Sequence, residues 1–459
     1  MSAIWSELRR QVTNRPRTVA LQDADRAVCY GQLFDEVDRR VVALKEQRTV
    51  TLGLALPNSV EWVLWDLAAR KAGVVCVPIP PFFSQPQVQH LVADAGIDTM
   101  LLSDGLKKIS VPVEGHRSLV CKITYTSGST GTPRGVCLTE AGIDQVALSL
   151  IEMLGTEFAR NHLSVMPLAV LLENVAGVYP ALMIGSTVHL GDCAAFHREP
   201  GTLLTALNET RASSAILVPE LLRGMVPLVR KNRTPLNDLR FVAVGGARVS
   251  TGLITDARSI GLPVYEGYGL SECASVVSLN TPEHDRAGSA GKLLPHIKAR
   301  VVCGELLIDN PSASGYLGGD SFTVLHTGDC GSIDNDGYLS ISGRKKNTLI
   351  TSWGRNIQPE WVETVLLDQP AILQSMIIGE GRSSLGALVV AAPGGCAKSA
   401  AIALRTANRQ LPEYAQVKRF RMVEPFTCAN KQLTGNGRIV RSAILKLHTQ
   451  GNHHEDIIL

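Results

Sequence analysis

The sequence predicts an α/β protein whose long first part carries mostly parallel sheets and whose last part is a small α+β unit. Up to about residue 270, short apolar runs alternate with segments whose apolar residues recur at helical spacing. This alternation is typical of parallel sheets covered by helices on both faces. After residue 298, short apolar runs are separated by Gly and Asn-Asp-Gly turns, which are typical of antiparallel strands.

The first part supplies its helices and strands in alternating order. Leu33, Val37 and Val41 recur at helical spacing, and Gly73 marks the end of a later helix. We expect helices at 5–14, 28–46, 59–72 and 87–95, and strands at 50–56, 74–78, 100–102, 214–218, 239–244 and 263–266.

The last part differs because its strands are short and its turns are tight. A charged link that begins with a glycine, at 343–346, separates the antiparallel strands from a helix-rich tail. We therefore place a domain boundary near Lys346. We expect strands at 298–302, 305–308, 338–342, 375–379 and 387–391, and helices at 359–367 and 399–409.

Composition excludes several classes of protein. The chain has 459 residues with 45 Lys and Arg against 42 Asp and Glu, and this balance gives no electrostatic footprint for nucleic acid. The longest apolar run, 165–184, is interrupted by Glu173 and Asn174, so we expect no membrane span. None of the ten cysteines forms C-x-x-C, and the N-terminus lacks a signal peptide's apolar core. We expect a cytoplasmic protein in a reducing compartment.

A loop rich in Ser, Thr and Gly follows the short strand that begins at Ile123. Between Thr126 and Gly135 it holds five hydroxyl side chains, three glycines and one cation, Arg134. Glycines let backbone N–H groups face one anion, so the loop can wrap a polyphosphate. It is not a Walker A loop, because no Gly-Lys-Ser/Thr follows at the required spacing. A polar linker is the alternative, which its position between two strand-like runs disfavours.

The run T-S-G-S-T-G-T-P-R-G resembles the phosphate-loop signature of the adenylate-forming (AMP-binding) enzymes, which include acyl-CoA and aryl-CoA ligases. Further segments resemble motifs of that family in the family's order: Gly245-Gly246-Ala247, Tyr268-Gly269-Leu270-Ser271-Glu272, His326-Thr327-Gly328-Asp329, Gly343-Arg344-Lys345-Lys346, Trp353-Gly354 and Pro359-Glu360-x-x-Glu363. The resemblance covers nearly the whole chain. It implies a large N-terminal AMP-binding domain, 1–345, with a small distorted barrel, followed by a small mobile C-terminal domain, 346–459.

The resemblance also implies a role for each motif. The loop would hold the β- and γ-phosphates of ATP through Thr126, Ser127, Gly128, Ser129, Thr130, Gly131 and Arg134. The remaining nucleotide-binding residues would seat adenine, phosphate and ribose: Gly245, Gly246, Ala247, Tyr268, Gly269, Ser271, Asp329 and Arg344. Glu272 would hold Mg²⁺, and Lys346 would be the hinge between domains. Each motif taken alone would be an ordinary turn, strand end or solvated charge run.

The last motif departs from the family pattern. The segment QLTGNGRIVR has Arg438 where the family has the lysine that contacts the acyl carboxylate and the α-phosphate. Arginine keeps the charge but presents a broad planar fork in place of a compact ammonium. It can clamp a phosphate through two hydrogen bonds, or it can be too wide for the site. Lys431, seven residues earlier, is a possible substitute.

The segment after Met166 points to the acid that would be activated. The residues at the place where many relatives carry a histidine or an aromatic residue are Ala169, Val170, Leu171 and Leu172. No Asp lies between Val165 and Gly191, and we expect Glu173 to make a structural hydrogen bond or ion pair. An α-amino acid substrate is therefore disfavoured, and an apolar fatty or aryl acid is favoured.

Two hypotheses of function follow. In the first, the protein is an acid–thiol ligase that uses ATP and Mg²⁺ to form an acyl-AMP and passes the acyl group to coenzyme A or to the phosphopantetheine of an acyl carrier protein. In the second, prompted by Arg438, it is a catalytically weakened nucleotide-binding homologue that acts as a regulator or partner. We favour the enzyme because the other phosphate and Mg²⁺ positions match. A basic face for a carrier protein, with an ordinary solvated face as the alternative, would comprise Arg405, Arg409, Lys418, Arg419 and Arg421.

Overall fold

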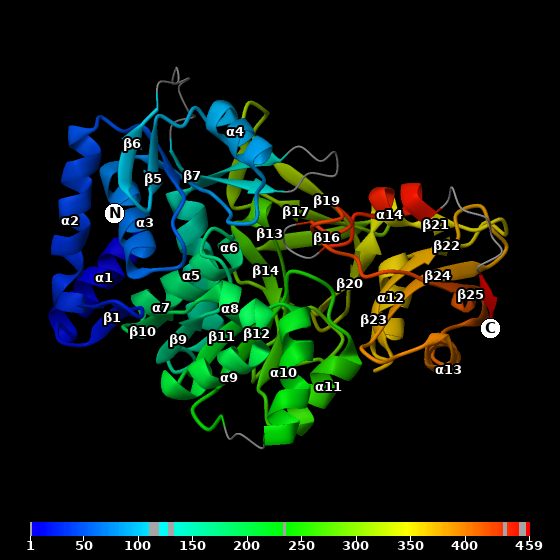
Figure 1. Cartoon of the computed structure of the whole chain (residues 1–459). Helices are drawn as coiled ribbons and strands as arrows, with labels where there is room; N and C mark the ends of the chain where they lie inside the picture. Colours follow the sequence, from blue (N-terminus) through cyan, green and yellow to red (C-terminus); the bar gives the residue numbers. More distant parts are fainter. Residues whose placement is uncertain (1, 110–118, 127–132, 233–235, 435–437, 449–455) are drawn as a thin grey trace. The chain divides into compact units, whose positions relative to one another are not determined.

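The computed structural model describes residues 2–109, 119–126, 133–232, 236–434, 438–448 and 456–459 (Figure 1). The chain forms two compact units. The larger unit comprises residues 1–246, 255–299 and 308–325, and the smaller unit comprises 247–254, 300–307 and 326–459. Each unit is described by itself.

One sheet of the larger unit has parallel strands at its centre and antiparallel strands at its edges. β3 pairs in parallel with β4 and β5, and β4 pairs in parallel with β7. β6, β8 and β18 add to it in antiparallel fashion. Its order is β18 (Ala313–Tyr316), β8 (Arg134–Thr139), β7 (Val120–Thr126), β4 (Val75–Pro78), β3 (Thr51–Leu54), β5 (Thr99–Leu102) and β6 (Gly105–Lys108).

The second sheet of the larger unit follows the same plan. Its strands run parallel from β1 to β13, and β2, β14 and β15 add antiparallel edges. Its order is β15 (Lys292–Leu293), β14 (Ser275–Leu279), β13 (Val264–Leu270), β12 (Phe241–Val244), β11 (Ser214–Leu217), β9 (Asn161–Ser164), β10 (Thr187–Leu190), β1 (Val19–Gln22) and β2 (Ala27–Cys29).

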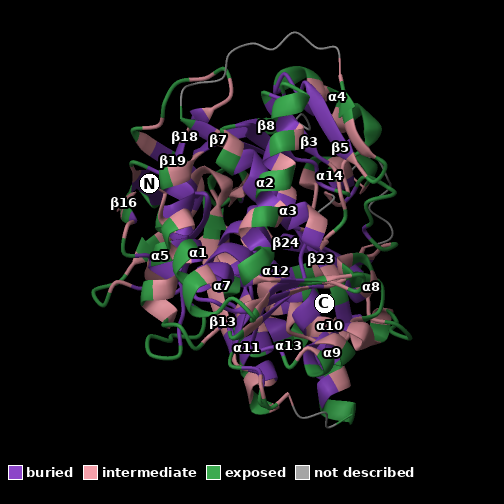
Figure 2. Cartoon of the chain, turned by 90° about the vertical axis from the view of Figure 1, so that its left-hand side faces the viewer, coloured by how far each residue is buried: buried purple, intermediate pink, exposed green. Residues whose placement is uncertain are grey.

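Helices cover these sheets and bury one side of themselves, as the mixed colouring of α2 shows (Figure 2). α3 begins after Ser59, whose hydroxyl accepts a hydrogen bond from the Trp62 amide, and ends at Gly73 in the left-handed conformation. The helical segments are α1 (Ala3–Asn14), α2 (Tyr30–Glu46), α3 (Val60–Ala72), α4 (Gln85–Asp94), α5 (Glu140–Leu154), α6 (Leu171–Glu173), η1 (Asn174–Val178), α7 (Tyr179–Met183), α8 (Cys193–Arg198), α9 (Pro200–Glu209), α10 (Pro219–Asn232), α11 (Thr251–Ser259) and η2 (Ser271–Cys273).

The smaller unit contains most of one four-stranded sheet, a two-stranded hairpin and a second four-stranded sheet. The strands are β16 (Lys298–Val302), β17 (Glu305–Asp309), β19 (Val324–Ile333) and β20 (Leu339–Arg344), then β21 (Leu349–Ile350) and β22 (Asn356–Ile357), then β23 (Ile372–Ile378), β24 (Leu385–Ala391), β25 (Val417–Met422) and β26 (Ile457–Ile458). Its helical segments are η3 (Lys345–Asn347), α12 (Pro359–Leu367), α13 (Ala397–Asn408), η4 (Glu413–Ala415) and α14 (Arg441–His448).

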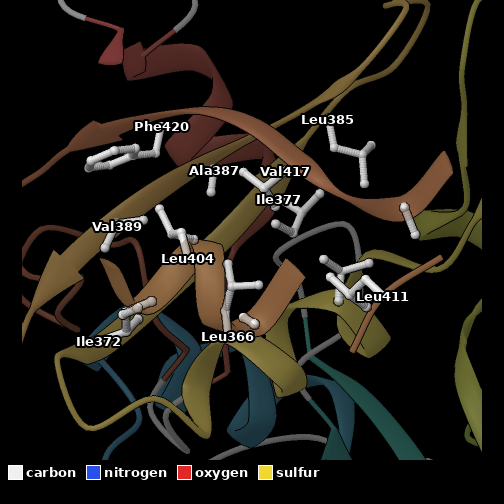
Figure 3. Close-up of a cluster of buried hydrophobic side chains, with 14 of the residues drawn as sticks. Leu366, Ile372, Ile377, Leu385, Ala387, Val389, Leu404, Leu411, Val417 and Phe420 are labelled. Carbon is white, nitrogen blue, oxygen red and sulfur yellow. The ribbon is translucent and has the colours of Figure 1, made fainter. Parts of the chain in front are cut away.

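The core of the smaller unit lies between α12, α13 and the sheet of β23, β24 and β25. Leu366, Leu404 and Phe420 are at most 1% exposed and belong to one buried cluster (Figure 3). The smaller unit thus has a hydrophobic core of its own. Within the described residues, no helix combines the length and the apolar character needed to cross a membrane.

The α/β prediction is confirmed, and the differences from the expected bounds have local causes. The expected helix at 359–367 and strand at 298–302 have the predicted bounds. The helix expected at 28–46 begins at Tyr30, because 27–29 forms β2 and Cys29 caps the helix. The strand expected at 263–266 continues to Leu270, because its last residues pair with β14.

Candidate active site

The hairpin of β7 and β8 carries the Ser/Thr/Gly loop at its tip. Thr126 and Arg134 face one another in the register of the two strands, so they stand at the two ends of the loop. The side chain of Arg134 is therefore fixed at its base by a strand. The predicted phosphate-binding residues Ser127, Gly128, Ser129, Thr130 and Gly131 lie outside the described residues.

A tyrosine links the cation of this hairpin to the acidic residue of a separate motif. The Arg134 guanidinium lies 3.8 Å from the centre of the Tyr316 ring, a short cation–π contact. The Tyr316 hydroxyl donates a hydrogen bond to Glu272 Oε1 at 2.7 Å. β8, β18 and η2 thus bring together a cation and a carboxylate that lie 138 positions apart in the sequence. Tyr316 is a candidate site residue that the sequence motifs do not indicate.

The segment Tyr268–Glu272 forms the end of β13 and the turn into β14. A Cβ on Gly269 would run into the backbone carbonyl oxygen of Ser275 on β14, so only glycine allows the two strands this approach. Ser271 and Glu272 lie in the turn η2, which ends at Ala274 with φ of 56°. A tight turn on paired strands holds the Glu272 carboxylate at a defined position.

The Gly-Gly-Ala turn follows β12 directly. Gly246 has φ of 82°, a conformation that favours glycine, while Gly245 lies beside the Gly267 backbone. The nearest side chains to a Cβ on Gly246 would be those of Val218, at 3.5 Å, and Leu172, at 3.9 Å. The turn therefore borders apolar side chains. Ala247, the third residue of the motif, belongs to the smaller unit.

A buried histidine–carboxylate pair holds the backbone that follows β9. Glu173 Oε1 lies 2.8 Å from His162 Nε2, and His162 Nδ1 lies 2.9 Å from the Ser214 hydroxyl oxygen. The second oxygen of Glu173 accepts hydrogen bonds from the backbone amides of Val165 and Met166. Glu173 is fully buried, so these bonds account for a carboxylate in the interior. The structure confirms the structural role expected of Glu173.

A second buried charge network anchors β7 below the loop. Lys122 Nζ lies 2.8 Å from Asp66 Oδ1 and also contacts Asn174 Oδ1. Tyr179 donates to Asp66 Oδ2 at 2.6 Å. Burial opposes ionisation of Asp66, but Lys122 and these hydrogen bonds outweigh it and lower the pKa of the carboxyl. Burial also disfavours the charged form of Lys122, but the attraction of Asp66 outweighs the cost of burial. The pKa of Lys122 is therefore raised.

In the smaller unit, the residues expected at the ribose are paired with each other. Asp329 on β19 faces Arg344 on β20 in the antiparallel register, and Arg344 Nε lies 2.7 Å from Asp329 Oδ1. Arg344 also donates to the Thr327 carbonyl at 3.1 Å. Gly328, between Thr327 and Asp329, has φ of 69° and its amide donates to Glu305. A nucleotide's hydroxyls would meet a carboxylate whose position an arginine already fixes.

The neighbouring basic residues differ in environment. Lys345 reaches Glu305 Oε2 at 2.8 Å, and this hydrogen bond lowers the pKa of Glu305. Lys346, the expected hinge residue, has its pKa lowered by partial burial and by the nearby Arg344. Lys346 is therefore the cation in this segment whose charged form is least favoured.

The segment QLTGNGRIVR, which carries Arg438 in place of the family's lysine, forms a hairpin with an antiparallel bridge between Leu433 and Ile439. Residues 435–437 lie outside the described residues. The Thr434 amide donates to the Arg438 carbonyl at 2.8 Å, and the Arg438 amide donates to the Thr434 hydroxyl at 3.0 Å. Arg441 behind it reaches Glu363 Oε2 at 2.5 Å, which ties the hairpin to α12. Arg438 and Lys431 are both exposed, and Lys431 has φ of 60°. The motif thus presents Arg438 from a braced loop.

These residues fit the chemistry of a nucleotide and its metal. Mg²⁺ is usually held by one or two carboxylates together with substrate phosphates. Glu272 offers one such carboxylate, and no cluster of three metal-ligating side chains occurs in the described part of the chain. A Mg²⁺ ion held by Glu272 could complete its coordination with nucleotide phosphates and waters.

Comparisons with known proteins match this arrangement. The family model described as AMP-binding enzyme matches residues 8–121 and 107–317, and the model described as AMP-binding enzyme C-terminal domain matches residues 346–451. The chain is 26% identical over 445 residues to the indoleacetate–CoA ligase of Aromatoleum aromaticum, covering 82% of this chain and 85% of that protein.

Solved structures share the fold at low sequence identity. The anthranilate CoA ligase AuaEII, in complex with anthranoyl-AMP, has a TM-score of 0.86 and 19% identity, with 97% of each chain covered. The O-succinylbenzoate coenzyme A synthetase of Bacillus subtilis, in complex with ATP and a magnesium ion, has a TM-score of 0.79 and 23% identity, with 95% of this chain and 98% of that chain covered. The fold is thus a large α/β part followed by a small α+β part.

Proposed function

The chain belongs to the AMP-binding enzyme family, and we propose that it converts an apolar carboxylic acid, fatty or aryl, into an acyl-AMP and then into a thioester. The single observation that carries this proposal is the contact of Arg134, Tyr316 and Glu272. It places a cation from the predicted phosphate loop on the same tyrosine that holds the predicted Mg²⁺ carboxylate. This is the grouping that a metal-bound polyphosphate needs.

In the first half-reaction, a carboxylate oxygen of the acid attacks the α-phosphorus of ATP, and pyrophosphate leaves. The chain supplies positioning and charge for this step. Arg134 and the loop at 127–132 would hold the β- and γ-phosphates, and Glu272 would hold Mg²⁺, which neutralises phosphate charge when bound. Arg438 would face the charge that develops at the α-phosphate, with Lys431 as its possible substitute.

The adenosine part of the nucleotide would be held by groups that the fold already orders. Tyr268 and the Gly245–Gly246–Ala247 turn would seat the base, with Gly269 allowing close approach and Ser271 facing phosphate. Asp329 would accept hydrogen bonds from the ribose hydroxyls, and its contact with Arg344 supports this assignment because the ion pair holds the carboxylate in place.

In the second half-reaction, a thiol attacks the acyl carbonyl of the acyl-AMP, a thioester forms and AMP leaves. We propose the boundary between the domain at 1–345 and the domain at 346–459 as the point at which the chain changes between half-reactions, with Lys346 as its hinge. Coenzyme A or a carrier-protein phosphopantetheine would supply the thiol. The names of the relatives given above support coenzyme A.

The pocket for the carboxylic acid substrate would lie against the backbone of Val165 and Met166, whose amides donate hydrogen bonds to Glu173. Leu172 and Val218, which border Gly246, give that region an apolar lining. The named relatives act on aromatic acids by their names, so aryl acids lead the panel of candidates. Medium-chain and long-chain fatty acids complete it.

The test is pyrophosphate release by the purified protein with ATP, Mg²⁺ and this panel. We expect release with at least one apolar acid, and mass spectrometry of the product should give the acyl-AMP, or the acyl thioester when coenzyme A is added. Removing Mg²⁺ with a chelator should stop release. Release no greater than the rate without acid, for every acid, would overturn the proposal.

One observation favours a second candidate function, that of a catalytically weakened nucleotide-binding homologue. Arg438 stands where the family has lysine, although its loop is braced by Arg441. The discriminating experiment is Arg438→Lys. If the parent releases pyrophosphate at a rate comparable to the variant, the homologue hypothesis fails. If ATP raises the melting temperature of both proteins and only the variant is active, the hypothesis stands.

A further inference from the structure

The helix α4 contacts both strands of the hairpin that carries the Ser/Thr/Gly loop. The Tyr125 hydroxyl, on β7, donates a hydrogen bond to Asp94 Oδ2 at 2.6 Å. His90 Nε2 lies 3.0 Å from the carbonyl oxygen of Pro133, the residue before β8. Because a carbonyl oxygen only accepts, the His90 ring donates this bond. One helix thus holds a residue beside each end of the loop.

The helix α4 is itself held by contacts other than these two bonds. A capping box formed by Ser84 and Gln87 begins the helix. Leu91 is fully buried and belongs to the same hydrophobic cluster as residues of β4 and β7. His90 and Asp94 are four positions apart, which places them on one face of the helix. The helix therefore presents a donor and an acceptor to the hairpin from a fixed position.

The surroundings of Tyr125 fix the direction of its hydroxyl. Gly135 faces Tyr125 in the register of the hairpin, and a Cβ on Gly135 would lie 3.2 Å from the tyrosine ring. The His90 ring meets the same ring edge-on, with the two centroids 6.2 Å apart. Burial and the hydrogen bond to Asp94 raise the pKa of Tyr125, so the hydroxyl stays protonated and donates. The ring is thus held between β8 and α4.

These contacts act on the two ends of the loop that the structure describes. Tyr125 immediately precedes Thr126, and Pro133 immediately precedes Arg134. Thr126 and Arg134 face one another across the hairpin. The guanidinium of Arg134, the cation proposed above for the phosphates of ATP, lies over the Tyr316 ring. The helix α4 therefore holds the backbone from which Arg134 extends, while Tyr316 holds the tip of its side chain.

We propose that His90 and Asp94 are positioning residues for the binding of the β- and γ-phosphates of ATP. They act through Pro133 and Tyr125 and do not touch the nucleotide. The proposal rests on the proposed function and deepens it, because it adds two residues that lie outside every motif given above. A loop whose ends are already held loses less conformational freedom when the phosphates bind, and this strengthens binding.

A purely structural role for the two side chains is the alternative. Either role predicts that their removal lowers the melting temperature, because each makes a hydrogen bond between separate elements. Only the positioning role predicts a loss of binding that depends on whether the ligand carries β- and γ-phosphates. ATP and AMP share the adenosine and the α-phosphate, so a comparison of the two ligands separates the roles.

The test uses His90→Ala and Asp94→Ala, each with a conservative variant. His90→Gln keeps an N–H donor, and Asp94→Asn keeps an oxygen acceptor. The matched control is Gln89→Ala, which truncates an exposed side chain on the same helix. Binding of ATP with Mg²⁺, and of AMP, is measured by calorimetry without any acid substrate, and the melting temperature of each variant is recorded.

We expect the Kd for ATP to rise about fivefold in each alanine variant, the effect of losing one hydrogen bond. The Kd for AMP should stay at the parent value, so the ratio of the two constants should change. His90→Gln and Asp94→Asn should recover most of the ATP affinity. The KM for ATP in pyrophosphate release should rise by a factor similar to that of the Kd, and Gln89→Ala should match the parent in both measurements.

Unchanged ATP binding in both alanine variants would overturn the proposal. An equal rise of the Kd for AMP would overturn it too, because it would assign the two side chains a structural role alone. If the parent binds ATP but releases no pyrophosphate with any acid, the proposed function fails alone, since the comparison of ATP with AMP still decides the role of His90 and Asp94. A parent that binds no ATP would overturn both.

Discussion

Replacing Lys122 by methionine removes the only cation paired with Asp66 among the described side chains and leaves a carboxylate that is 1% exposed. Asp66 would keep the hydrogen bonds from Tyr179, at 2.6 Å, and Asn174, at 3.2 Å, but these carry no net charge. Breaking a buried ion pair in this way typically costs ~3–5 kcal/mol. At ~2 °C or more per kcal/mol for a unit of this size, we expect the melting temperature to fall by about 6 °C or more.

The pH dependence distinguishes this cause from a simple loss of packing. In the parent, the pKa of Asp66 is lowered, so the pair stabilises the fold above the unfolded pKa of ~3.9 and that stability is lost as pH falls through the folded value. In the variant, unpaired burial raises the pKa of Asp66, and stability is lost as pH rises through it. The difference between the two proteins should therefore widen from about pH 4 upward.

The assay is denaturant unfolding at a series of pH values, with two further variants. Lys107→Met removes an exposed lysine paired with Asp104 and should leave the midpoint unchanged, because solvent screens that pair. Lys122→Met combined with Asp66→Asn removes both charges and should recover part of the loss. A cost below ~1 kcal/mol at pH 7, or the same cost at pH 4 and pH 8, would refute the reasoning.

Three further predictions concern single contacts. Gly177→Ala would place a Cβ 2.5 Å from His162 Nε2 and should cost ~1–3 kcal/mol in denaturant unfolding, whereas Gly201→Ala, which meets nothing within 4 Å, should be neutral or stabilising. Arg441→Gln leaves Glu363 buried without its cation, so its thermal stability should fall more at pH 8 than at pH 5, and an equal fall would contradict this. Tyr316→Phe removes the hydroxyl that donates to Glu272, the carboxylate proposed to hold Mg²⁺, and pyrophosphate release should fall about tenfold at limiting Mg²⁺.

The sequence was most informative where structure is decided locally. The helix at 359–367 begins with Pro359 at its first turn, and the end of the helix before Gly73 is marked by a residue that adopts the left-handed conformation at no cost. The turns of the motifs can be predicted in the same way, because they need positive φ at Gly246 and Gly328 and glycine adopts it readily. Patterns of this kind need no knowledge of distant contacts.

Contacts between distant segments could not be predicted from the same patterns. Tyr316 looks like an ordinary strand residue until β18 is placed beside β8, where it meets Arg134. Lys122 interrupts an apolar strand without indicating that Asp66, 56 positions earlier, is its partner. Trp353 could be assigned to a motif, but its 76% exposure and the hollow that it lines depend on the β23–β24 loop and on Tyr414.

The two units each order their own part of the candidate site through internal contacts. In the larger unit, Tyr316 fixes the cation and the carboxylate expected at the polyphosphate. In the smaller unit, Asp329 and Arg344 fix one another. Each arrangement is made of contacts within its own unit. Both groups precede the proposed hinge at Lys346 and are expected to bind the same nucleotide. Because each is preorganised by contacts of its own, less ordering is needed when ATP binds for the first half-reaction.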